Sequence, residues 1–587
     1  MISAWITIAT TITVIAMLLY TKVRSDAVFL SAICVLYVSG VLDANDAFSG
    51  FSSQAVIVTA ILSIVVVGVQ QTGLLQWMVK NIFGHPNGYP KTLLRMMLPV
   101  AALSSFINNT TVAMLFCSIV KLWAQKLGIS PLRLYIPMIY AVLMGGVCTL
   151  IGTPSNLVIS ELYSEATGKT MNMFAPFVPG VICLVVGMAF IIFMRRLQPE
   201  HNAPESAFEL TSDYTVELLV PSDNPYIGMT VAEAGLAKVN GGRIIEIIHF
   251  DEVISPAENE PIMGGDRLIF AGRIEEILEL KKTHGLVNAE NHVFSMSEVD
   301  RKRQLLTAYV KIGSSLIGST LGYGTFQKEH NLTLVAVARR GERLDVSPRE
   351  VKLKAGDTLL LECPPKLKFH HEKLDSQLQF FDSSEVVNFG SGIIISSIII
   401  TVMLVLIALN VVSLLEGTIL AAFAMVIFRC CSIEQAMNSL NWRLLIGMAG
   451  SIVLGMAMQK TGIAEEMSQG ILNVCGTHPI VVMAAICLIA TLITQLVMNV
   501  AVGAMFFPIM YNAAVNIGYD PFTFLIALMV AVNAAFATPI GAPANMLVYG
   551  PGGYRFSDYM RIGIPLVIII NIVGIAAACF MFPLTRF

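Results

Sequence analysis

Long runs of apolar residues, interrupted by short polar clusters, dominate the pattern along this chain. A helix needs about 20 apolar residues to cross a bilayer. Segments of this kind lie near 2–20, 27–42, 53–70, 93–123, 132–151 and 174–194, and again near 390–411, 412–428, 444–459, 479–516, 522–537 and 562–583. The pattern predicts an α-helical polytopic membrane protein with two membrane halves, residues 1–197 and 386–587.

Two of these runs exceed one span and carry polar clusters in their middle. Residues 93–123 include Ser104, Ser105, Asn108, Asn109 and Thr110, and residues 479–516 include Thr494, Gln495 and Asn499. Unwound backbone at membrane depth is tolerated only where it is packed in protein or lines a cavity. We therefore expect both runs to be re-entrant hairpins whose polar tips form a binding site.

The two membrane halves resemble each other at matching positions. Gly-Thr-Pro-Ser-Asn-Leu at 152–157 matches Gly-Ala-Pro-Ala-Asn-Met at 541–546, and Gln-Thr-Gly at 71–73 matches Lys-Thr-Gly at 460–462. Asn109 likewise corresponds to Asn499. Internal repeats in a polytopic protein are typical of secondary transporters, which hold their substrate between the repeats at broken helices.

Charge is distributed unevenly between the membrane halves and the segment that separates them. Residues 198–385 hold 49 of the 77 Lys, Arg, Asp and Glu residues. Only 13% of the whole chain is charged, against about a quarter in soluble domains. This composition excludes a soluble enzyme, a nucleic-acid binder and a disordered scaffold, so we expect no catalytic residues, no enzyme activity and no covalent cofactor.

The segments that should form the site, over 98–120, 134–160, 479–519 and 521–554, contain no Asp, Glu, Lys, Arg or His. A proton-coupled carrier normally needs a buried titrating group, whereas neutral oxygens and freed carbonyls suit sodium ions. An anion can be held without arginine by backbone N–H groups at helix N-termini. The glycine and proline at 152–154 and 541–543 favour such helix starts. These residues therefore indicate sodium-coupled transport of an anion.

At these motifs the sequence resembles the divalent-anion/sodium symporter (DASS) family of the ion-transporter superfamily. That family has two inverted repeats, each with a re-entrant hairpin ending in Ser-Asn-Thr and a later unwound helix with a Thr-Pro-type turn. Here Asn-Asn-Thr at 108–110 and Gly-Thr-Pro at 152–154 look like the first pair, and Met-Asn-Val at 498–500 and Gly-Ala-Pro at 541–543 like the second. The resemblance implies this inverted-repeat fold.

The resemblance also implies two sodium sites and one substrate site. The implied sodium ligands are Ser104 or Ser105, Asn108, Asn109 and the backbone at Gly152 for the first site, and Thr494, Asn499 and the backbone at Val497 and Gly541 for the second. The implied substrate contacts are Asn109, Thr110, Thr153, Pro154, Asn499, Val500, Ala542 and Pro543. Because Met498 and Val500 replace the hydroxyl residues of the family motif, we expect a compact anion such as sulfate, as in DASS relatives that carry a soluble insert.

The charged segment contains a second internal repeat of about 90 residues. Pro-Tyr-Ile-Gly-Met-Thr at 225–230 matches Ser-Leu-Ile-Gly-Ser-Thr at 315–320, and Gly-Asp at 265–266 matches Gly-Asp at 356–357. The pattern resembles a tandem pair of TrkA-C (RCK-C) domains, small α/β domains at 207–290 and 291–372. We expect the Gly-Asp pairs to be structural turns, and Arg339 and Arg340 to be candidate contacts for an anionic effector such as a nucleotide.

Arg195 and Arg196 directly follow the sixth apolar segment, so the positive-inside tendency predicts that residues 198–385 are cytoplasmic. We expect a multi-pass protein of the cytoplasmic or inner membrane of a prokaryote. It should form a homodimer in the lipid bilayer, with the insert regulating transport or stabilising the dimer. Three alternatives stay open: a sodium-coupled di- or tricarboxylate transporter, an RCK-regulated ion channel and an anion-sensing membrane receptor.

Overall fold

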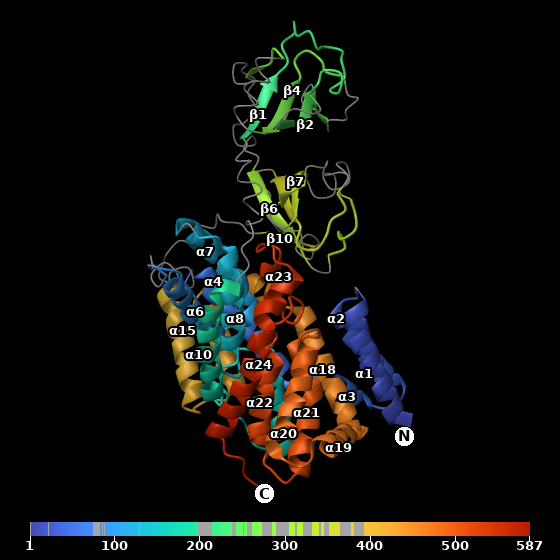
Figure 1. Ribbon diagram of the computed structural model, residues 1–587, viewed down its shortest axis with the longest axis vertical. Coiled ribbons are helices and arrows are strands. Elements are labelled where there is room, and N and C mark those ends of the chain that lie inside the picture. The colour runs from blue at the N-terminus through green and yellow to red at the C-terminus, as the bar shows by residue number, and fades with distance from the viewer. Residues whose placement is uncertain are drawn as a thin grey trace. The chain divides into compact units, whose positions relative to one another are not determined.

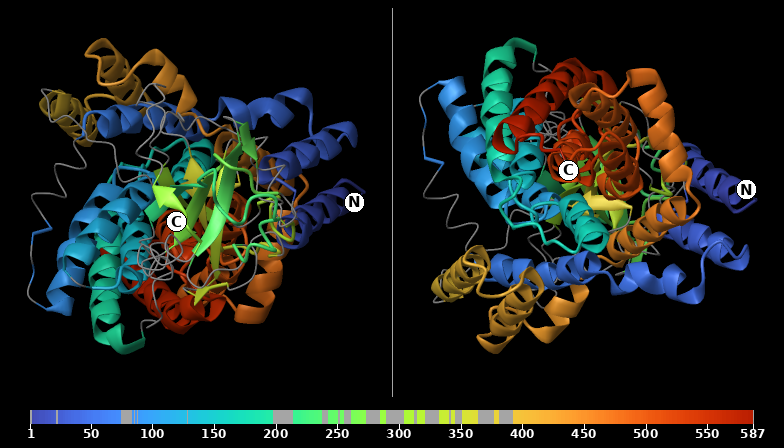
Figure 2. Two further views of the ribbon diagram at one scale, coloured as in Figure 1. Left: turned by 90° about the horizontal axis from the view of Figure 1, so that it is seen from above. Right: turned by 90° about the horizontal axis from the view of Figure 1, so that it is seen from below.

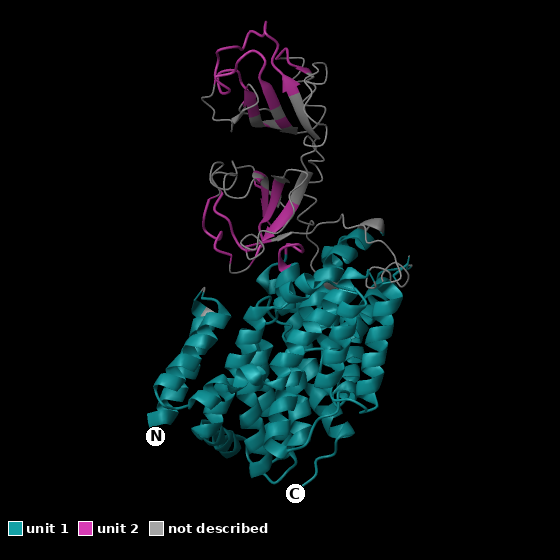
Figure 3. Ribbon diagram, turned by 180° about the vertical axis from the view of Figure 1, so that it is seen from behind, with its two compact units in different colours: residues 1–199, 384–548, 554–587 teal, residues 200–383, 549–553 magenta. Residues whose placement is uncertain are grey.

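The described chain divides into two compact units (Figure 3). The computed structural model describes residues 2–21, 23–73, 83–84, 86, 88–127, 129–197, 214–236, 242–249, 252–254, 261–272, 284–288, 304–311, 314–320, 332–339, 342–344, 351–363, 377–380 and 392–586. A helical unit comprises Met1–Pro199, Ser384–Val548 and Tyr554–Phe587, and an insert unit comprises Glu200–Ser383 and Tyr549–Gly553. The predicted ends of the membrane halves, at 197 and 386, lie close to these unit boundaries.

The helical unit is built from α-helices joined by short loops (Figure 1). Its first half contains α1 (Ile2–Tyr20), α2 (Ser25–Val38), α3 (Ala44–Ser49), the 3-10 turn η1 (Gly50–Ser52), α4 (Gln54–Gln71), α6 (Tyr89–Ser104), α7 (Asn109–Lys126), α8 (Leu132–Gly146), α9 (Pro154–Thr167), α10 (Phe177–Phe193) and η2 (Met194–Leu197). Its second half contains α15 (Gly392–Ala408), α16 (Leu414–Ile427), α17 (Ile433–Asn438), α18 (Trp442–Lys460), α19 (Ile463–Cys475), α20 (Pro479–Thr494), α21 (Asn499–Asn516), α22 (Pro521–Asn533), α23 (Pro543–Tyr549) and α24 (Phe556–Met581). Each apolar segment predicted from the sequence overlaps at least one of these helices.

Within the described residues, three helical stretches are long and apolar enough to cross a membrane by length and composition. They are Ala44–Gln71, Trp442–Lys460 and Phe556–Met581. The pair Ile463–Cys475 and Pro479–Thr494, bent by 120°, would add a fourth if it counts as one span. Further apolar helices have 10–17 residues, which is short for a full crossing and typical of spans that are broken or re-entrant.

The peripheral helices expose apolar side chains on their outer faces. In both views of Figure 2, α15 and α16 lie at one edge of the helical unit and α1 lies at another. Along α15, the exposed fractions of Ile394, Ile398 and Val402 are 66%, 56% and 50%. These residues are four positions apart and so share one helix face. A continuous apolar face of this kind is suited to contact with lipid acyl chains.

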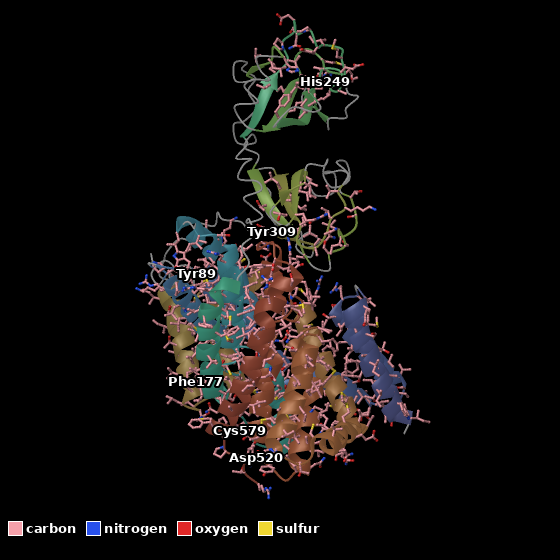
Figure 4. The ribbon with its side chains drawn as sticks, in the orientation of Figure 1. Tyr89, Phe177, His249, Tyr309, Asp520 and Cys579 are labelled. Carbon is pink, nitrogen blue, oxygen red and sulfur yellow. The ribbon has the colours of Figure 1, made fainter. Side chains whose placement is uncertain are left out.

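The structure confirms that the helices break at both predicted polar clusters. α6 ends at Ser104 and α7 begins at Asn109, while α20 ends at Thr494 and α21 begins at Asn499. Tyr89 begins α6 at one end of the helical unit, and Asp520, which follows α21, lies at the opposite end (Figure 4). The two hairpins therefore enter the unit from opposite ends, with their polar tips inside.

A second pair of breaks lies at the glycine–proline motifs. α8 ends at Gly146 and α9 begins at Pro154, with Thr153 in an extended conformation as its N-cap. α22 ends at Asn533 and α23 begins at Pro543. Proline suits the first helical position because that residue needs no intrahelical N–H donor. The helix starts expected from sequence at 154 and 543 are confirmed.

The described residues of the insert unit form two five-stranded antiparallel sheets of the same design. The first has β1 (Tyr214–Leu219), β2 (Gly242–His249), β3 (Glu252–Ile254), β4 (Arg267–Gly272) and β5 (Val287–Asn288), and the second has β6 (Gln304–Val310), β7 (Thr333–Arg339), β8 (Glu342–Arg343), β9 (Thr358–Cys363) and β10 (Leu378–Phe380). The strand orders are β3-β2-β4-β1-β5 and, read from the other end, β8-β7-β9-β6-β10. Both sheets carry an irregularity at the same place, between Ile244 and Glu246 and between Leu334 and Ala336. The sequence repeat thus coincides with a repeated sheet.

The Gly-Asp pairs form the turns before β4 and β9, as the sequence predicted. Gly265 and Gly356 have φ angles of +92° and +82°, which favour glycine. The Asp266 carboxylate accepts a hydrogen bond from the Met263 amide at 2.7 Å, and the Asp357 carboxylate accepts one from the Lys354 amide at 2.7 Å. Each carboxylate therefore closes its own turn.

The end of the neighbouring strand supplies each aspartate with a cationic or titratable partner. His249, which Figure 4 labels in the first sheet, contacts Asp266 through its Nδ1. At the equivalent position Arg339 donates from Nε and Nη2 to both oxygens of Asp357, at 2.8 and 2.7 Å. The Asp357 carboxylate raises the pKa of Arg339. Arg339 thus has a structural partner within its own sheet, and its predicted role toward an effector stays a prediction, as does that of Arg340, which lies outside the described residues.

Replacing Arg339 by leucine should destabilise the second sheet, because the side chain of Asp357 is only 1% exposed and would keep an unpaired charge. Breaking a buried pair by removing one partner costs about 3 kcal/mol or more. The measurement is amide hydrogen exchange of β9 in the full-length protein. Lys354→Ala is the matched control, since this side chain is exposed and only its backbone amide contacts Asp357. Unchanged protection of β9 in Arg339→Leu would contradict the prediction.

Candidate functional site

A small cavity lies where the hairpin tips and the glycine–proline motifs come together. Its volume is about 60 Å³, whereas ligand pockets for drug-sized molecules measure about 300–1,000 Å³. All eight predicted substrate contacts line it, namely Asn109, Thr110, Thr153, Pro154, Asn499, Val500, Ala542 and Pro543. The other lining residues are Asn108, Leu143, Ser155, Leu444, Met498, Asn533 and Ala544. The structure therefore brings two sequence motifs from each half to one point.

Among the described residues that line the cavity there are hydroxyl and amide groups but no ionisable side chain. Three helices of at least 14 residues, α7, α9 and α21, have their first residues among the lining residues, and the short helix α23 starts there as well. Helix N-termini present unpaired N–H groups and the positive end of the helix dipole. This arrangement suits a compact anion better than a cation or a neutral solute.

In the first half, oxygen atoms of the hairpin tip gather beside Gly152. Ser104 is fully buried and donates a hydrogen bond from Oγ to Asn109 Oδ1 at 2.7 Å. A Cβ atom at Gly152 would lie 2.9 Å from the Ser104 carbonyl oxygen and still closer to that of Gly146. The absence of a side chain at Gly152 thus allows these carbonyls to approach the unwound loop.

Two other predicted ligands of the first half have partners of their own. The Ser105 hydroxyl donates toward the carbonyl oxygens of Ala101 and Gly145, at 3.0 and 2.9 Å. Asn108 lines the cavity, and its Oδ1 accepts a hydrogen bond from the Thr110 amide at 3.0 Å. Between the two serines left open by the sequence, Ser104 is the one that contacts Asn109.

In the second half, Thr494 and Asn499 occupy the corresponding positions. The buried Thr494 hydroxyl donates to the Val532 carbonyl at 2.8 Å and lies 3.3 Å from Asn499 Oδ1. Because a hydroxyl has one hydrogen, the shorter contact with Val532 leaves two acceptor oxygens facing each other. A Cβ atom at Gly541 would lie 2.8 Å from the Thr494 carbonyl oxygen. Val497 is 2% exposed and lies in the turn between α20 and α21.

A threonine that the sequence analysis did not select closes the unwound loop of the first half. The Thr149 hydroxyl donates to the Ser105 carbonyl and accepts from the Gly152 amide at 3.2 Å. The Thr149 carbonyl in turn accepts a hydrogen bond from Asn156 Nδ2 at 3.0 Å. These bonds fix the loop that carries Gly152 against the hairpin tip.

The second half contains the same three bonds. The Thr538 hydroxyl donates to the Gln495 carbonyl and accepts from the Gly541 amide at 3.0 Å, and the Thr538 carbonyl accepts from Asn545 Nδ2 at 2.9 Å. Each of these four residues lies 389 or 390 positions after its counterpart. Thr149 and Thr538 are separated by the same 389 positions as the glycine–proline motifs. A search for threonine pairs with this separation would therefore have found them.

Asn533 is an amide in the cavity wall that the sequence analysis did not select. It is the last residue of α22, lines the cavity and is 1% exposed. The residue 389 positions earlier is Met144, so the repeat carries no signal for it. A single amide within the apolar run 522–537 was the available sign, since buried amides in a membrane protein need partners.

Comparison with known proteins assigns the family. A family profile described as "Citrate transporter" (CitMHS) matches residues 15–524 and, in a second match, residues 468–586. The chain belongs to this citrate transporter family. It is therefore an integral multi-pass membrane transporter and not an enzyme, as the sequence predicted.

Several curated relatives align with most or part of this chain. "Uncharacterized transporter sll0640" of Synechocystis is 28% identical over 588 residues, which cover 97% of this chain and 95% of the relative. "Putative sulfur deprivation response regulator" of Chlamydomonas reinhardtii is 27% identical over 93% of this chain and 96% of the relative. "Sodium/sulfate cotransporter 1" of Chlamydomonas reinhardtii is 27% identical over 54% of this chain and 38% of the relative.

Proposed function

We propose that the chain is a sodium-coupled secondary transporter of a small divalent anion, with sulfate as the substrate, working by alternating access. The observation that carries the proposal is the cavity of about 60 Å³ on which helix N-termini and the amides of Asn109 and Asn499 converge, with no ionisable side chain among its described lining residues. Anions bind to helix N-termini without a cationic side chain. Sodium ions bound beside the cavity would supply the missing positive charge, so that neither solute binds well alone.

The proposed sodium ligands are neutral oxygens from each hairpin and its unwound loop. For the first ion they are Ser104 or Ser105, Asn108, Asn109 and the backbone at Gly152, and for the second they are Thr494, Asn499 and the backbone at Val497 and Gly541. Support comes from the contact between Ser104 and Asn109 at 2.7 Å and from the facing oxygens of Thr494 and Asn499 at 3.3 Å. Broken helices with free carbonyls provide sodium sites of this type in other transporters.

The proposed architecture is a pair of inverted repeats. The matching hydrogen bonds of Thr149 and Thr538 support it, as do the opposite entry directions of the two hairpins.

We further propose that the two insert sheets are a tandem TrkA-C pair on the cytoplasmic side, and that this pair regulates transport through an effector such as a nucleotide. We also propose that the chain forms a homodimer in a prokaryotic inner membrane. The shared strand order of the two sheets supports the tandem assignment.

The substrate choice rests on the walls of the cavity and on the relatives. Met498, Val500 and Ala542 offer no hydroxyl groups to a second carboxylate, and two relatives carry names that refer to sulfate or sulfur. A di- or tricarboxylate is the second candidate, because the family profile is described as a citrate transporter.

Uptake of radiolabelled sulfate into proteoliposomes tests the proposal. An inward sodium gradient should stimulate uptake by about 5- to 150-fold over an equal potassium gradient, the range typical of coupled binding sites. An excess of unlabelled citrate or succinate outside should leave this uptake unchanged. Sulfate uptake that ignores sodium would refute sodium coupling, whereas sodium-dependent uptake of citrate but not of sulfate would establish the second candidate.

A further inference from the structure

Asn533 uses every hydrogen-bonding position of its amide. Its Nδ2 donates to Asn156 Oδ1 at 2.9 Å and to the Met529 carbonyl at 2.8 Å. Its Oδ1 accepts from Ser155 Oγ at 3.0 Å and from Asn499 Nδ2 at 3.3 Å. An amide has two donor hydrogens and two acceptor lone pairs. With the side chain 1% exposed, this full set of partners holds it in one orientation.

The partners of Asn533 come from both halves of the helical unit. Ser155 and Asn156 belong to the first turn of α9, in the first half, whereas Asn499 begins α21, in the second half. Helix α9 also packs against both α21 and α22. Asn533 therefore links the start of α9 to the tip of the second hairpin through direct hydrogen bonds.

The hydrogen bonds of Asn533 continue on one side toward the proposed sodium-binding residues and on the other toward the proposed anion-binding residues. On one side, Asn499 Oδ1 faces the Thr494 hydroxyl at 3.3 Å. On the other side, Ser155 Oγ lies 3.3 Å from Thr153 Oγ1 in the cavity wall. A continuous polar path thus runs from the oxygens proposed for the second sodium ion to the helix start proposed to hold the anion.

The two halves differ at this point. The equivalent of Asn533 in the first half is Met144, which has no amide. Correspondingly, Asn156 Oδ1 has a donor in Asn533, whereas Asn545 Oδ1, its counterpart in the second half, is buried and has no hydrogen-bond partner among the described residues. The link is therefore specific to one sodium position and one helix start.

We propose that Asn533 is a positioning residue that couples the second sodium ion to the anion site. This inference rests on the proposed function. A cation at Asn499 Oδ1 orients that amide so that its Nδ2 points at Asn533. The fixed Asn533 amide then holds Ser155 and Asn156, and with them the N–H groups of the first turn of α9, toward the anion. Sodium at the second hairpin thereby raises the affinity for the anion through Asn533.

The test compares Asn533→Leu, which keeps the approximate volume but removes the hydrogen bonds, with wild type in the full-length protein. Sulfate binding is measured with and without saturating sodium, and the ratio of the two affinities is the readout. In wild type we expect sodium to raise sulfate affinity by about 5- to 150-fold. In Asn533→Leu this factor should fall below about twofold. A residue with a structural role alone would lower the yield of folded protein and leave the ratio unchanged.

The matched control is Asn571→Leu. Asn571 lies in α24, accepts a hydrogen bond from Thr491 at 3.0 Å and donates to the Val567 carbonyl at 2.9 Å, but it does not line the cavity. We expect this variant to keep the wild-type ratio. If Asn533→Leu does not fold, Asn533→Ser, which retains one hydroxyl, should show a reduced ratio.

Two outcomes separate the inference from the function on which it rests. A wild-type sodium effect that persists at full size in the Asn533 variant would overturn the inference and leave the proposed function standing. A wild-type protein whose sulfate binding does not respond to sodium would refute the proposed function itself.

Discussion

Replacing Asn109 or Asn499 by alanine is expected to abolish sodium-coupled anion uptake while leaving the protein folded. Each amide begins a helix, lines the cavity and faces a hydroxyl, of Ser104 or of Thr494. Interactions with charged groups are worth about 1.5–3 kcal/mol each, which corresponds to about 10- to 150-fold in affinity. Because each amide is proposed to bind sodium and to border the anion, both affinities should fall together, and uptake should drop to the background of empty liposomes.

The measurement is initial-rate sulfate uptake into proteoliposomes across a range of sodium concentrations. Asn516→Ala is a matched control, because Asn516 ends the same helix as Asn499 but is exposed and hydrogen-bonded to Glu465 at 2.8 Å. It should transport at the wild-type rate. Near-normal sodium-dependent uptake in either cavity variant would show that the ligand assignment is wrong.

The breaks in the helices could be predicted from sequence because polar residues inside a long apolar run have few alternatives at membrane depth. Ser104 and Asn109 mark one break and Thr494 and Asn499 the other, and the structure confirms both positions. The glycine–proline motifs also predicted the helix starts correctly, because proline suits the first helical position, where no intrahelical N–H donor is needed.

The hydrogen-bond partners within the site could not be predicted in the same way. A serine or threonine in a membrane helix can bond the preceding turn, a neighbouring helix or a ligand, and sequence does not distinguish these cases. Ser105 illustrates the point, because its hydroxyl reaches the backbone of both Ala101 and Gly145. Asn533 was missed for a different reason. Its partners Ser155 and Asn156 lie more than 370 positions away, and its counterpart Met144 hides it from a repeat comparison.

In the insert, too, features set by adjacent residues could be predicted from sequence, whereas contacts between residues far apart in the chain could not. The turns at Gly265 and Gly356 were predictable because glycine with a positive φ and a following aspartate is a local signature. The pairing of Arg339 with Asp357, 18 positions away, depends on the register of β7 and β9 and was not foreseen. The sequence suggested an effector contact for Arg339; the structure adds a partner within its own sheet, and the effector role stays a prediction.

Gly152→Ala should be the most damaging small substitution in the unwound loops. The added Cβ would lie 2.9 Å from the Ser104 carbonyl oxygen and closer to that of Gly146, and both are backbone atoms that cannot rotate away. Overpacking of this kind costs about 1–3 kcal/mol. Relief would require the loop to move from the hairpin tip, which would disperse the oxygens proposed for the first sodium ion. We expect the sodium concentration for half-maximal uptake to rise by about 5- to 150-fold, because a cost of about 1–3 kcal/mol changes an equilibrium constant by this factor.

Gly541→Ala should have the same effect to a smaller degree. The added Cβ would lie 2.8 Å from its nearest neighbouring atom and 3.1 Å from the next, which is less close than at Gly152. Gly503→Ala is the control, since a Cβ there would meet its neighbours at 3.5 Å or more, an ordinary contact distance. Gly503 lies inside α21, where alanine also favours the helix by about 1 kcal/mol. Sodium dependence measured in the three variants should therefore rank Gly152→Ala above Gly541→Ala, with Gly503→Ala unchanged. A wild-type sodium dependence in Gly152→Ala would show that close approach of the carbonyls at this glycine is not needed for coupling.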